Sequence, residues 1–210
     1  MIIILFGAPG VGKGTIAQQL QAQGLGKQVS TGDLFRKEIS LNSEVSKVAR
    51  KYIDVGQLVP DDITLKIVEN EIANGGNLLL DGYPRTVKQV KDLDTLLASQ
   101  GKKIDVVVNV VASGQVVIDR LVNRVVCVKC HAIYNKKYSP PKTSDVCDKC
   151  GGSVIHRSDD DENTIKTRYQ EYLTKTKPLL DTYKTRGLVV EVNSEDAGVI
   201  DKIKHLLQKS

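Results

Sequence analysis

The chain has 210 residues, of which 40% are hydrophobic and 26% charged, and its net charge is +5. This length and composition predict one globular domain with an insertion or two. The apolar run over residues 2–6 is too short for a membrane span and lacks the flanks of a signal peptide, which argues against a membrane protein and against secretion. Because the positive charge is dispersed, a small anionic ligand explains it as well as a nucleic acid would. We therefore expect a cytoplasmic protein with neither a membrane nor a nucleic acid as partner.

The N-terminal stretch MIIILFGAPGVGKGT predicts a buried strand, a glycine-rich loop and the start of a helix. Residues 7–13 have the pattern G-x-x-x-x-G-K, in which glycines let backbone N–H groups wrap a polyphosphate at close range. Lys13 can then reach the outer phosphates, and the positive end of the following helix lies beneath them. The general pattern has Ser or Thr directly after the lysine, but here Gly14 intervenes. Thr15 is therefore the candidate hydroxyl near a magnesium ion.

Helical periodicity then alternates with short apolar runs along the chain. Up to residue 111 we expect helices over 16–23, 34–39, 43–52, 61–73 and 87–99, and strands over 2–6, 27–29, 78–80 and 104–111. Beyond it we expect a helix that is capped by Ser113 and carries Arg120 and Arg124, followed by an inserted module over 125–158. A long helix over 159–184, with a boundary at Pro178, then precedes a strand over 188–192 and a helix over 197–208. This alternation predicts a doubly wound α/β fold with a parallel sheet.

The strand over 78–80 ends in the sequence DGYPRT, residues 81–86. An acid, two turn formers and an arginine there place polar groups at the carboxyl end of a strand. Open parallel sheets bind their ligands at that edge. The sequence therefore predicts that residues 81–86 contribute to a ligand site.

Four cysteines form two C-x-x-C pairs, Cys127 with Cys130 and Cys147 with Cys150. In a chain of cytosolic type this spacing favours a metal over disulfides. Four thiolates make a closed tetrahedral site, so we expect a structural metal that stabilises a module too small for its own core. Zinc is the first choice, although iron can occupy such a site. His131 is the rival ligand, but a histidine beside a ligand usually points elsewhere.

Taken alone, this module also suggests a zinc ribbon that binds nucleic acid. It lacks aromatic residues interleaved with its basic positions, and it is inserted in a phosphate-binding fold. We keep this as a minor hypothesis, which strong binding in a gel shift at low salt would support.

Several motifs together resemble one family, the adenylate kinases, and the match covers essentially the whole chain. The motifs are GAPGVGKGT at 7–15, STGDLFR at 30–36, GQLVPD at 56–61, DGYPRT at 81–86 followed by Gln89, DRLVNR at 119–124, and RSDD at 157–160 followed by Arg168. Any one of them could be a coincidence, but all of them in this order hardly could. The Gly14 that precedes Thr15 is the usual form in this family.

The resemblance implies reversible phosphoryl transfer from MgATP to AMP, giving two ADP. It implies a P-loop nucleoside monophosphate kinase fold with a five-stranded parallel sheet, helices on both faces, a helical AMP-binding arm and a small lid. The core would comprise residues 1–29, 60–122 and 161–210, the arm residues 30–59, and the lid residues 123–160. In long-lid members with four cysteines the lid carries a structural zinc, and most members of this size are monomers.

The resemblance also implies roles for individual residues. The ATP site would comprise Gly10, Val11, Gly12, Lys13, Gly14, Thr15, Arg120, Arg124, Ile133, Tyr134 and, on a loose match, Asp196. The AMP site would comprise Thr31, Arg36, Gln57, Leu58, Val59, Gly82, Tyr83, Pro84, Arg85, Gln89, Arg157 and Arg168, with Gln89 reading the adenine edge. Asp33, Asp81 and Thr15 would orient the waters around magnesium. Lys13, Arg85, Arg124, Arg157 and Arg168 would be catalytic, because phosphoryl transfer needs positive charge around three moving oxygens.

Several of these residues also have a purely structural interpretation. Gln89 could complete a capping box with Thr86. Thr31 and Asp33 could be plain helix caps, and Arg120 and Arg124 could share a solvated helix face. Asp159 and Asp160 could be first-turn acids that complement a helix dipole. In the family, Asp159 and Asp160 help to latch the lid.

Two other functions stay open. Another nucleoside monophosphate kinase would use UMP, CMP or GMP as acceptor. Thr31 with Gln89 favours AMP, but a few hydrogen bonds set acceptor specificity, so it is less secure than the reaction type. A P-loop switch protein would bind a nucleotide and signal, and the paired arginines argue against it.

Overall fold

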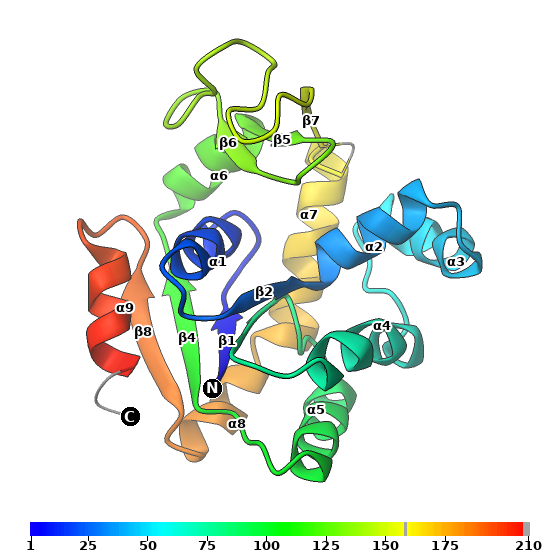
Figure 1. The fold of residues 1–210 in the computed structure, drawn as a ribbon, viewed down its shortest axis with the longest axis vertical. Coiled ribbons are helices and arrows are strands. Elements are labelled where there is room, and N and C mark those ends of the chain that lie inside the picture. Colours follow the sequence, from blue (N-terminus) through cyan, green and yellow to red (C-terminus); the bar gives the residue numbers. More distant parts are fainter. Residues whose placement is uncertain (158, 208–210) are drawn as a thin grey trace.

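A computed structural model describes residues 1–157 and 159–207. Its centre is a five-stranded sheet in the order β2-β3-β1-β4-β8, and every neighbouring pair of strands is parallel (Figure 1). The strands are β1 (Ile2–Phe6), β2 (Lys27–Ser30), β3 (Leu78–Asp81), β4 (Val106–Val111) and β8 (Val189–Asn193). The predicted doubly wound parallel sheet is therefore confirmed.

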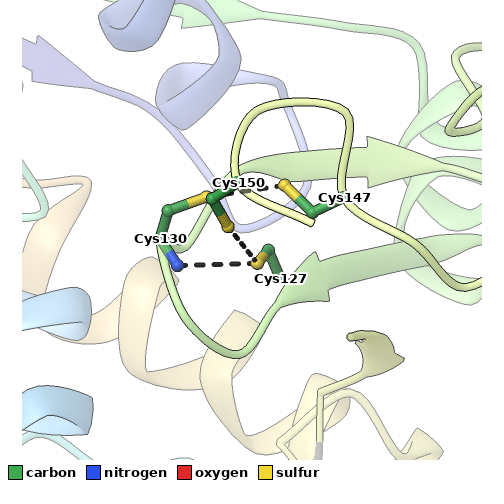
Figure 2. Close-up of side chains that lie close together, drawn as sticks. All are labelled: Cys127, Cys130, Cys147 and Cys150. Atoms are coloured by element: carbon green, nitrogen blue, oxygen red, sulfur yellow. Dashed lines mark hydrogen bonds between the residues drawn. The ribbon is translucent and has the colours of Figure 1, made fainter. Parts of the chain in front are cut away.

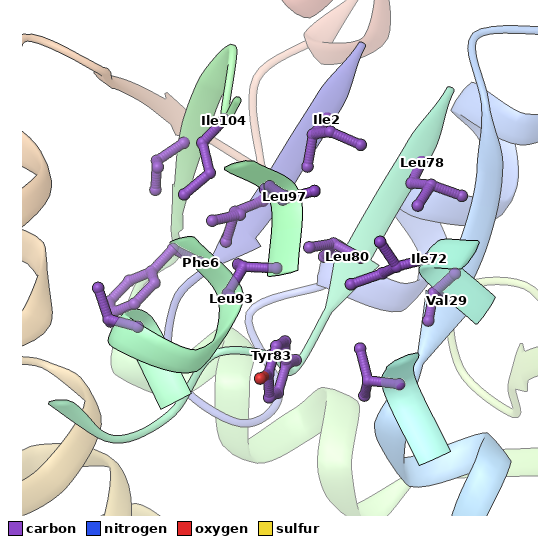
Figure 3. Close-up of a cluster of buried hydrophobic side chains, with 14 of the residues drawn as sticks. Ile2, Phe6, Val29, Ile72, Leu78, Leu80, Tyr83, Leu93, Leu97 and Ile104 are labelled. Carbon is purple, nitrogen blue, oxygen red and sulfur yellow. The ribbon is translucent and has the colours of Figure 1, made fainter. Parts of the chain in front are cut away.

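The sheet is buried on both faces, and the side chains of β1 divide between the two. Ile2, Ile4 and Phe6 pack in one cluster, while Ile3 and Leu5 pack in another. This alternation follows from the two-residue period of a strand. Figure 3 shows the first cluster, in which Leu93 and Leu97 of a neighbouring helix meet the sheet. Burying each such aliphatic side chain contributes about 1.5–3 kcal/mol.

Helices cover both faces, as predicted. On the face of Ile3 and Leu5 lie α1 (Lys13–Ala22) and α9 (Val199–Leu207). The other face is covered by α4 (Asp61–Ala73), α5 (Val87–Ser99) and α8 (Leu179–Thr185). Helix α6 (Gly114–Val122) follows β4 and leads out of the sheet layer (Figure 1). No helix among the described residues is both long and apolar enough to cross a membrane.

Two helices, α2 (Thr31–Ser40) and α3 (Glu44–Ile53), project from the sheet as a pair (Figure 1). They have a small core of their own, made by Phe35, Ala49 and Val59. After α3 the chain passes at Gly56 close to Thr164 and Arg168. The φ of Gly56 is +76°, and a Cβ there would lie 2.7 Å from the carbonyl oxygen of Thr164, so only glycine fits.

The cysteine-containing module forms a second sheet above α6 (Figure 1). Its antiparallel strands are β5 (Arg124–Cys127), β6 (Ile133–Asn135) and β7 (Val154–His156), in the order β6-β5-β7. Six residues form its own small core, and two of them are cysteines. The end of the predicted module, residue 158, lies outside the described residues.

The prediction that Arg120 and Arg124 share a helix face is wrong. Helix α6 ends at Val122, and Arg124 is the first residue of β5. The side chain of Asn123 donates to the carbonyl oxygen of Asp119, which ends the helix. Val125 and Val126, which are β-branched, then pair with β6 and β7.

The predicted long helix over 159–184 is divided into three segments. These are α7 (Glu162–Glu171), a π-helical segment η1 (Tyr172–Thr176) and α8, which begins directly after Pro178 as expected. Asp161 is the N-cap, because its carboxylate accepts from the backbone N–H groups of Asn163 and Thr164. Asp159 and Asp160 therefore precede the helix, and their interpretation as first-turn acids is wrong. The predicted last helix starts at Val199, and its predicted end, residue 208, lies outside the described residues.

Candidate functional site

A cavity of about 400 Å³ opens where β1 and β3 end. Its wall combines the loop after β1, the first turns of α1 and α2, the segment 56–59, the loop after β3, and the strands β5 and β6. Most of the predicted site residues line it: Gly10, Gly12, Lys13, Gly14, Thr15, Thr31, Asp33, Arg36, Gln57, Leu58, Val59, Asp81, Gly82, Arg85, Gln89, Arg120, Arg124, Ile133, Tyr134, Arg157 and Arg168. Residues far apart in the sequence thus meet at one site.

The glycine-rich loop leads directly into α1, whose first residue is Lys13. Gly7 has φ +137°, and a Cβ there would lie 2.3 Å from the carbonyl oxygen of Val110, so the loop requires glycine. The Lys13 ammonium donates to the carbonyl oxygens of Gly7 at 2.7 Å and Ala8 at 2.8 Å, which holds it across the loop. Burial lowers the pKa of Lys13 to about 7, because the attraction of the Asp81 carboxylate offsets only part of the cost of desolvating the ammonium group.

Five of the arginines that line the cavity lie close enough to one another to interact electrostatically, namely Arg36, Arg85, Arg124, Arg157 and Arg168. Burial and neighbouring guanidinium groups lower the pKa values of Arg85, Arg157 and Arg168. The Nε of Arg157 is buried and has no hydrogen-bond partner among the described residues. Such a crowd of buried cations is costly without anions. The site is therefore built for a strongly anionic ligand.

Carboxylates at one side partly neutralise these arginines. Arg124 pairs with Asp160, with Nε donating to Oδ2 at 2.7 Å. Arg168 donates from Nη1 to Asp160 at 3.0 Å and to Asp159 at 3.2 Å. The role of Asp159 and Asp160 is thus to pair with arginines. Arg36, Arg157 and Arg168 keep the pKa of Asp159 below its usual value although burial raises it.

The residues predicted to face magnesium lie on the wall of the cavity, with different partners. Asp33 accepts from Arg36 at 2.6 Å and lies 3.9 Å from Arg157. These arginines keep its pKa low although burial raises it. Asp81 accepts from Gln28 Nε2 at 3.2 Å, and Thr15 is exposed to the cavity. A hard cation prefers such oxygen groups, so the donor set fits magnesium.

The loop after β3 joins α2 and α5 at the wall of the cavity. Thr31 donates to the carbonyl oxygen of Gly82 at 2.9 Å, and Arg85 Nε donates to the same oxygen at 2.8 Å. Ser30, whose side chain accepts from the Asp33 N–H, is the N-cap of α2, so Thr31 and Asp33 are not plain caps. Gln89 accepts through Oε1 from the backbone N–H of Arg85, one residue before Thr86, so its contact differs from a regular capping box.

Comparison with known proteins agrees with this geometry. The model of the family described as adenylate kinase matches residues 5–188. The chain belongs to the adenylate kinase family. It is 39% identical to the adenylate kinase of Archaeoglobus fulgidus, over 100% of this chain and 99% of the relative. It is 41% identical to that of Bacillus cytotoxicus, over 93% and 92%, and 39% identical to that of Caldanaerobacter subterraneus subsp. tengcongensis, over 100% and 96%.

Arg120 of this adenylate kinase family member does not lie on a solvated surface. Its Nη1 donates to the backbone oxygen of Val11 at 2.9 Å and to Ser194 Oγ at 2.7 Å, so it joins the glycine-rich loop to the end of β8. Sequence reasoning missed Ser194, which also lines the cavity. Its position directly after a strand of the parallel sheet was the available signal.

Four residues implied by the family resemblance do not line the main cavity. Asp196 is exposed and lies 3.4 Å from Lys202. Val11 is buried and contributes its backbone oxygen to Arg120. Tyr83 and Pro84, in the loop after β3, line a second, smaller cavity, and Tyr83 belongs to the sheet core. The DGYPRT motif therefore supplies Gly82 and Arg85 to the main cavity, while Tyr83 packs inward.

The four cysteine sulfur atoms lie within 4.8 Å of one another (Figure 2). The Cys127–Cys150 and Cys130–Cys147 pairs are each separated by 3.5 Å. Four sulfur atoms at about 2.3 Å from one zinc ion would lie about 3.8 Å apart, so the cluster fits a tetrahedral site with four thiolate ligands. His131 is not part of the cluster. Backbone N–H groups of Lys129 and Cys130 point at the Cys127 sulfur, as thiolate ligands require.

Proposed function

We propose that this chain transfers the terminal phosphoryl group of MgATP reversibly to AMP, giving two ADP. The observation that carries the proposal is one cavity whose wall combines the glycine-rich loop, the segment 56–59 and five clustered arginines. The glycine-rich loop with Lys13 suits the triphosphate of the donor. The segment 56–59 with Thr31 and Gln89 suits a nucleoside monophosphate. The arginines would face the phosphates of both.

The proposed mechanism is a direct in-line transfer. Lys13 and the arginines Arg85, Arg124, Arg157 and Arg168 would hold the two phosphate chains in line and stabilise charge on the equatorial oxygens of the moving group. Arginine suits this task because its planar fork grips two oxygens at once. Magnesium, when bound with ATP, would neutralise charge on the donor phosphates, and Thr15, Asp33 and Asp81 would orient its waters. Arg120, beside Ser194, would lie against the donor adenine, with Ile133 and Tyr134 touching ATP from the lid.

We also propose that residues 30–59 and 123–160 close as two flaps over a core of residues 1–29, 60–122 and 161–210. Two ion pairs join the flaps and support this, Arg36 with Asp159 at 3.8 Å and Arg157 with Asp33 at 3.9 Å. Closure would keep water from competing with the acceptor for the phosphoryl group. In the lid, the four cysteines would hold a structural zinc ion. Asp159→Asn removes the first of these ion pairs and should raise ATP hydrolysis relative to transfer. An unchanged ratio of the two rates would contradict this role.

We propose a monomer, because most members of the adenylate kinase family of this size are monomers. We place it in the cytoplasm, where thiolates that ligate zinc stay reduced. Light scattering should give the chain mass of 23.0 kDa, and twice that mass at working concentration would contradict the monomer.

The low pKa of Lys13 gives a prediction for nucleotide binding. At about pH 8 a pKa of about 7 leaves Lys13 mostly uncharged in the free protein, and bound phosphates would raise the pKa toward its ordinary 10.5. Binding of ATP should therefore take up a proton. Calorimetry in two buffers that differ in ionisation enthalpy measures this uptake. Lys13→Met should abolish it, and equal binding enthalpies in both buffers for the unmodified chain would refute the expectation.

The acceptor is tested by measuring diphosphate formation from MgATP with AMP, UMP, CMP and GMP in turn. We expect AMP to give the highest kcat/KM. If UMP, CMP or GMP were used at least as well, the chain would be a different nucleoside monophosphate kinase. Turnover far below the typical enzyme median of about ten per second with every acceptor would favour the nucleotide switch instead.

A further inference from the structure

Gln89 lies in the first turn of α5, is almost fully buried and lines the cavity. Its side-chain amide has two partners of opposite kind. The backbone N–H of Arg85 donates to Oε1 at 2.7 Å, and Nε2 donates to Asp61 Oδ1 at 2.7 Å. Asp61 is the first residue of α4 and does not line the cavity, so it touches Gln89 from behind.

Each of these partners can either donate or accept a hydrogen bond, but not both. A backbone N–H only donates, and an ionised carboxylate only accepts. The amide oxygen of Gln89 must therefore face Arg85, and the amide nitrogen must face Asp61. Rotating the amide by half a turn would place N–H against N–H at Arg85 and oxygen against oxygen at Asp61. The order of donor and acceptor that Gln89 presents to the cavity is thus fixed.

Asp61 is itself held in place. The hydroxyl of Thr86 donates to Asp61 Oδ2 at 2.8 Å and accepts from the Gln89 backbone N–H at 3.1 Å. The carboxylate thereby joins the first turn of α4 to the first turn of α5. A negative charge is favourable at a helix N-terminus, so a carboxylate suits this position.

We propose that Asp61 is the positioning residue that sets the acceptor-base selectivity of this site, by holding the Gln89 amide in one orientation. The inference rests on the proposed function, in which Gln89 reads the acceptor base. Adenine offers a ring-nitrogen acceptor beside an amino donor, and an amide pairs with both at once only in the matching orientation. Guanine and uracil offer a ring N–H donor beside a carbonyl acceptor, the reverse order. Cytosine offers the same order as adenine.

This chemistry makes a selective prediction. When Asp61 no longer holds Gln89, the amide can turn to pair with guanine, so discrimination against GMP should fall. Discrimination against CMP should stay, because adenine and cytosine lose the same contact. A general loosening of the site would lower both.

The test uses Asp61→Leu, which removes the acceptor at similar size, and Asp61→Ala, which leaves room for water. The matched control is Asp62→Leu, since Asp62 is an exposed acid in the same first turn of α4. AMP competes with GMP, or with CMP, for limiting MgATP in one mixture. The product ratio gives the ratio of kcat/KM values, which does not depend on the fraction of folded enzyme.

We expect both Asp61 variants to lower the AMP-to-GMP ratio by about tenfold and to raise the KM for AMP, with the KM for ATP unchanged. The AMP-to-CMP ratio should stay within about twofold, and Asp61→Asn, which keeps an oxygen acceptor, should restore most of the selectivity. An AMP-to-GMP ratio within about twofold of the unmodified chain in both variants, or an equal fall in both ratios, would overturn the inference. If the unmodified chain formed no ADP from ATP and AMP, the proposed function would fail instead.

Discussion

Lys13→Met is expected to lower the rate of ADP formation about a thousandfold while the protein stays folded. The ammonium of Lys13 is held across the glycine-rich loop by two carbonyl oxygens and would move its charge with the transferred group. Removing one preorganised charge from such a site typically costs two to three orders of magnitude in rate. Burial already disfavours its charged form, but methionine also loses two hydrogen bonds, so the melting temperature should fall by only a few degrees.

The control for this variant is Lys27→Met. Lys27 is an exposed lysine at the start of β2 that pairs with Glu71. The Lys27→Met substitution should leave the rate unchanged, because an exposed ion pair contributes little to stability. A Lys13→Met enzyme within tenfold of the normal rate would refute the assignment of Lys13 to the transferring charge.

Cys147→Ser is expected to abolish binding of the proposed structural metal and to lower the melting temperature by about 10 °C, with a smaller effect on the rate at room temperature. The core of the module consists of six residues, two of which are cysteines, so the metal would supply much of its stability. Loss of a structural metal belongs to the group of changes that cost more than about 4 kcal/mol, and each kcal/mol shifts the melting temperature of a chain of this size by about 2–4 °C. Metal analysis and thermal melting on one sample measure both effects.

His131→Ala is the matched control, since His131 is next to Cys130 but outside the sulfur cluster. It should keep its metal and its melting temperature. Metal loss in His131→Ala as complete as in Cys147→Ser would make the histidine a ligand. A Cys147→Ser protein that kept its metal but lost all activity would contradict a structural role.

Local sequence was enough where a local pattern decides the structure. The apolar runs at 2–6 and 78–80 predicted buried strands, and the spacing of glycines before Lys13 predicted the loop. It failed where distant contacts decide. Arg120 and Arg124 have helical spacing, but strand pairing of Val125 and Val126 starts a sheet.

The same limit applies to the charged residues of the site. Three successive aspartates gave no local sign that Asp161 would be the cap and that Asp159 and Asp160 would pair with arginines. The contact between Asp61 and Gln89 joins two helices through side chains alone. Asp61 could be predicted only as a charge that complements a helix dipole.

We propose that one cavity passes a phosphoryl group directly between two adenine nucleotides. This claim is tested most directly by incubating the enzyme with AMP and MgATP labelled at the terminal phosphate, and by following the label. We predict that the label appears in the terminal phosphate of ADP, with two ADP formed for each ATP consumed and little inorganic phosphate. Label appearing as inorganic phosphate, with AMP unchanged, would contradict the claim.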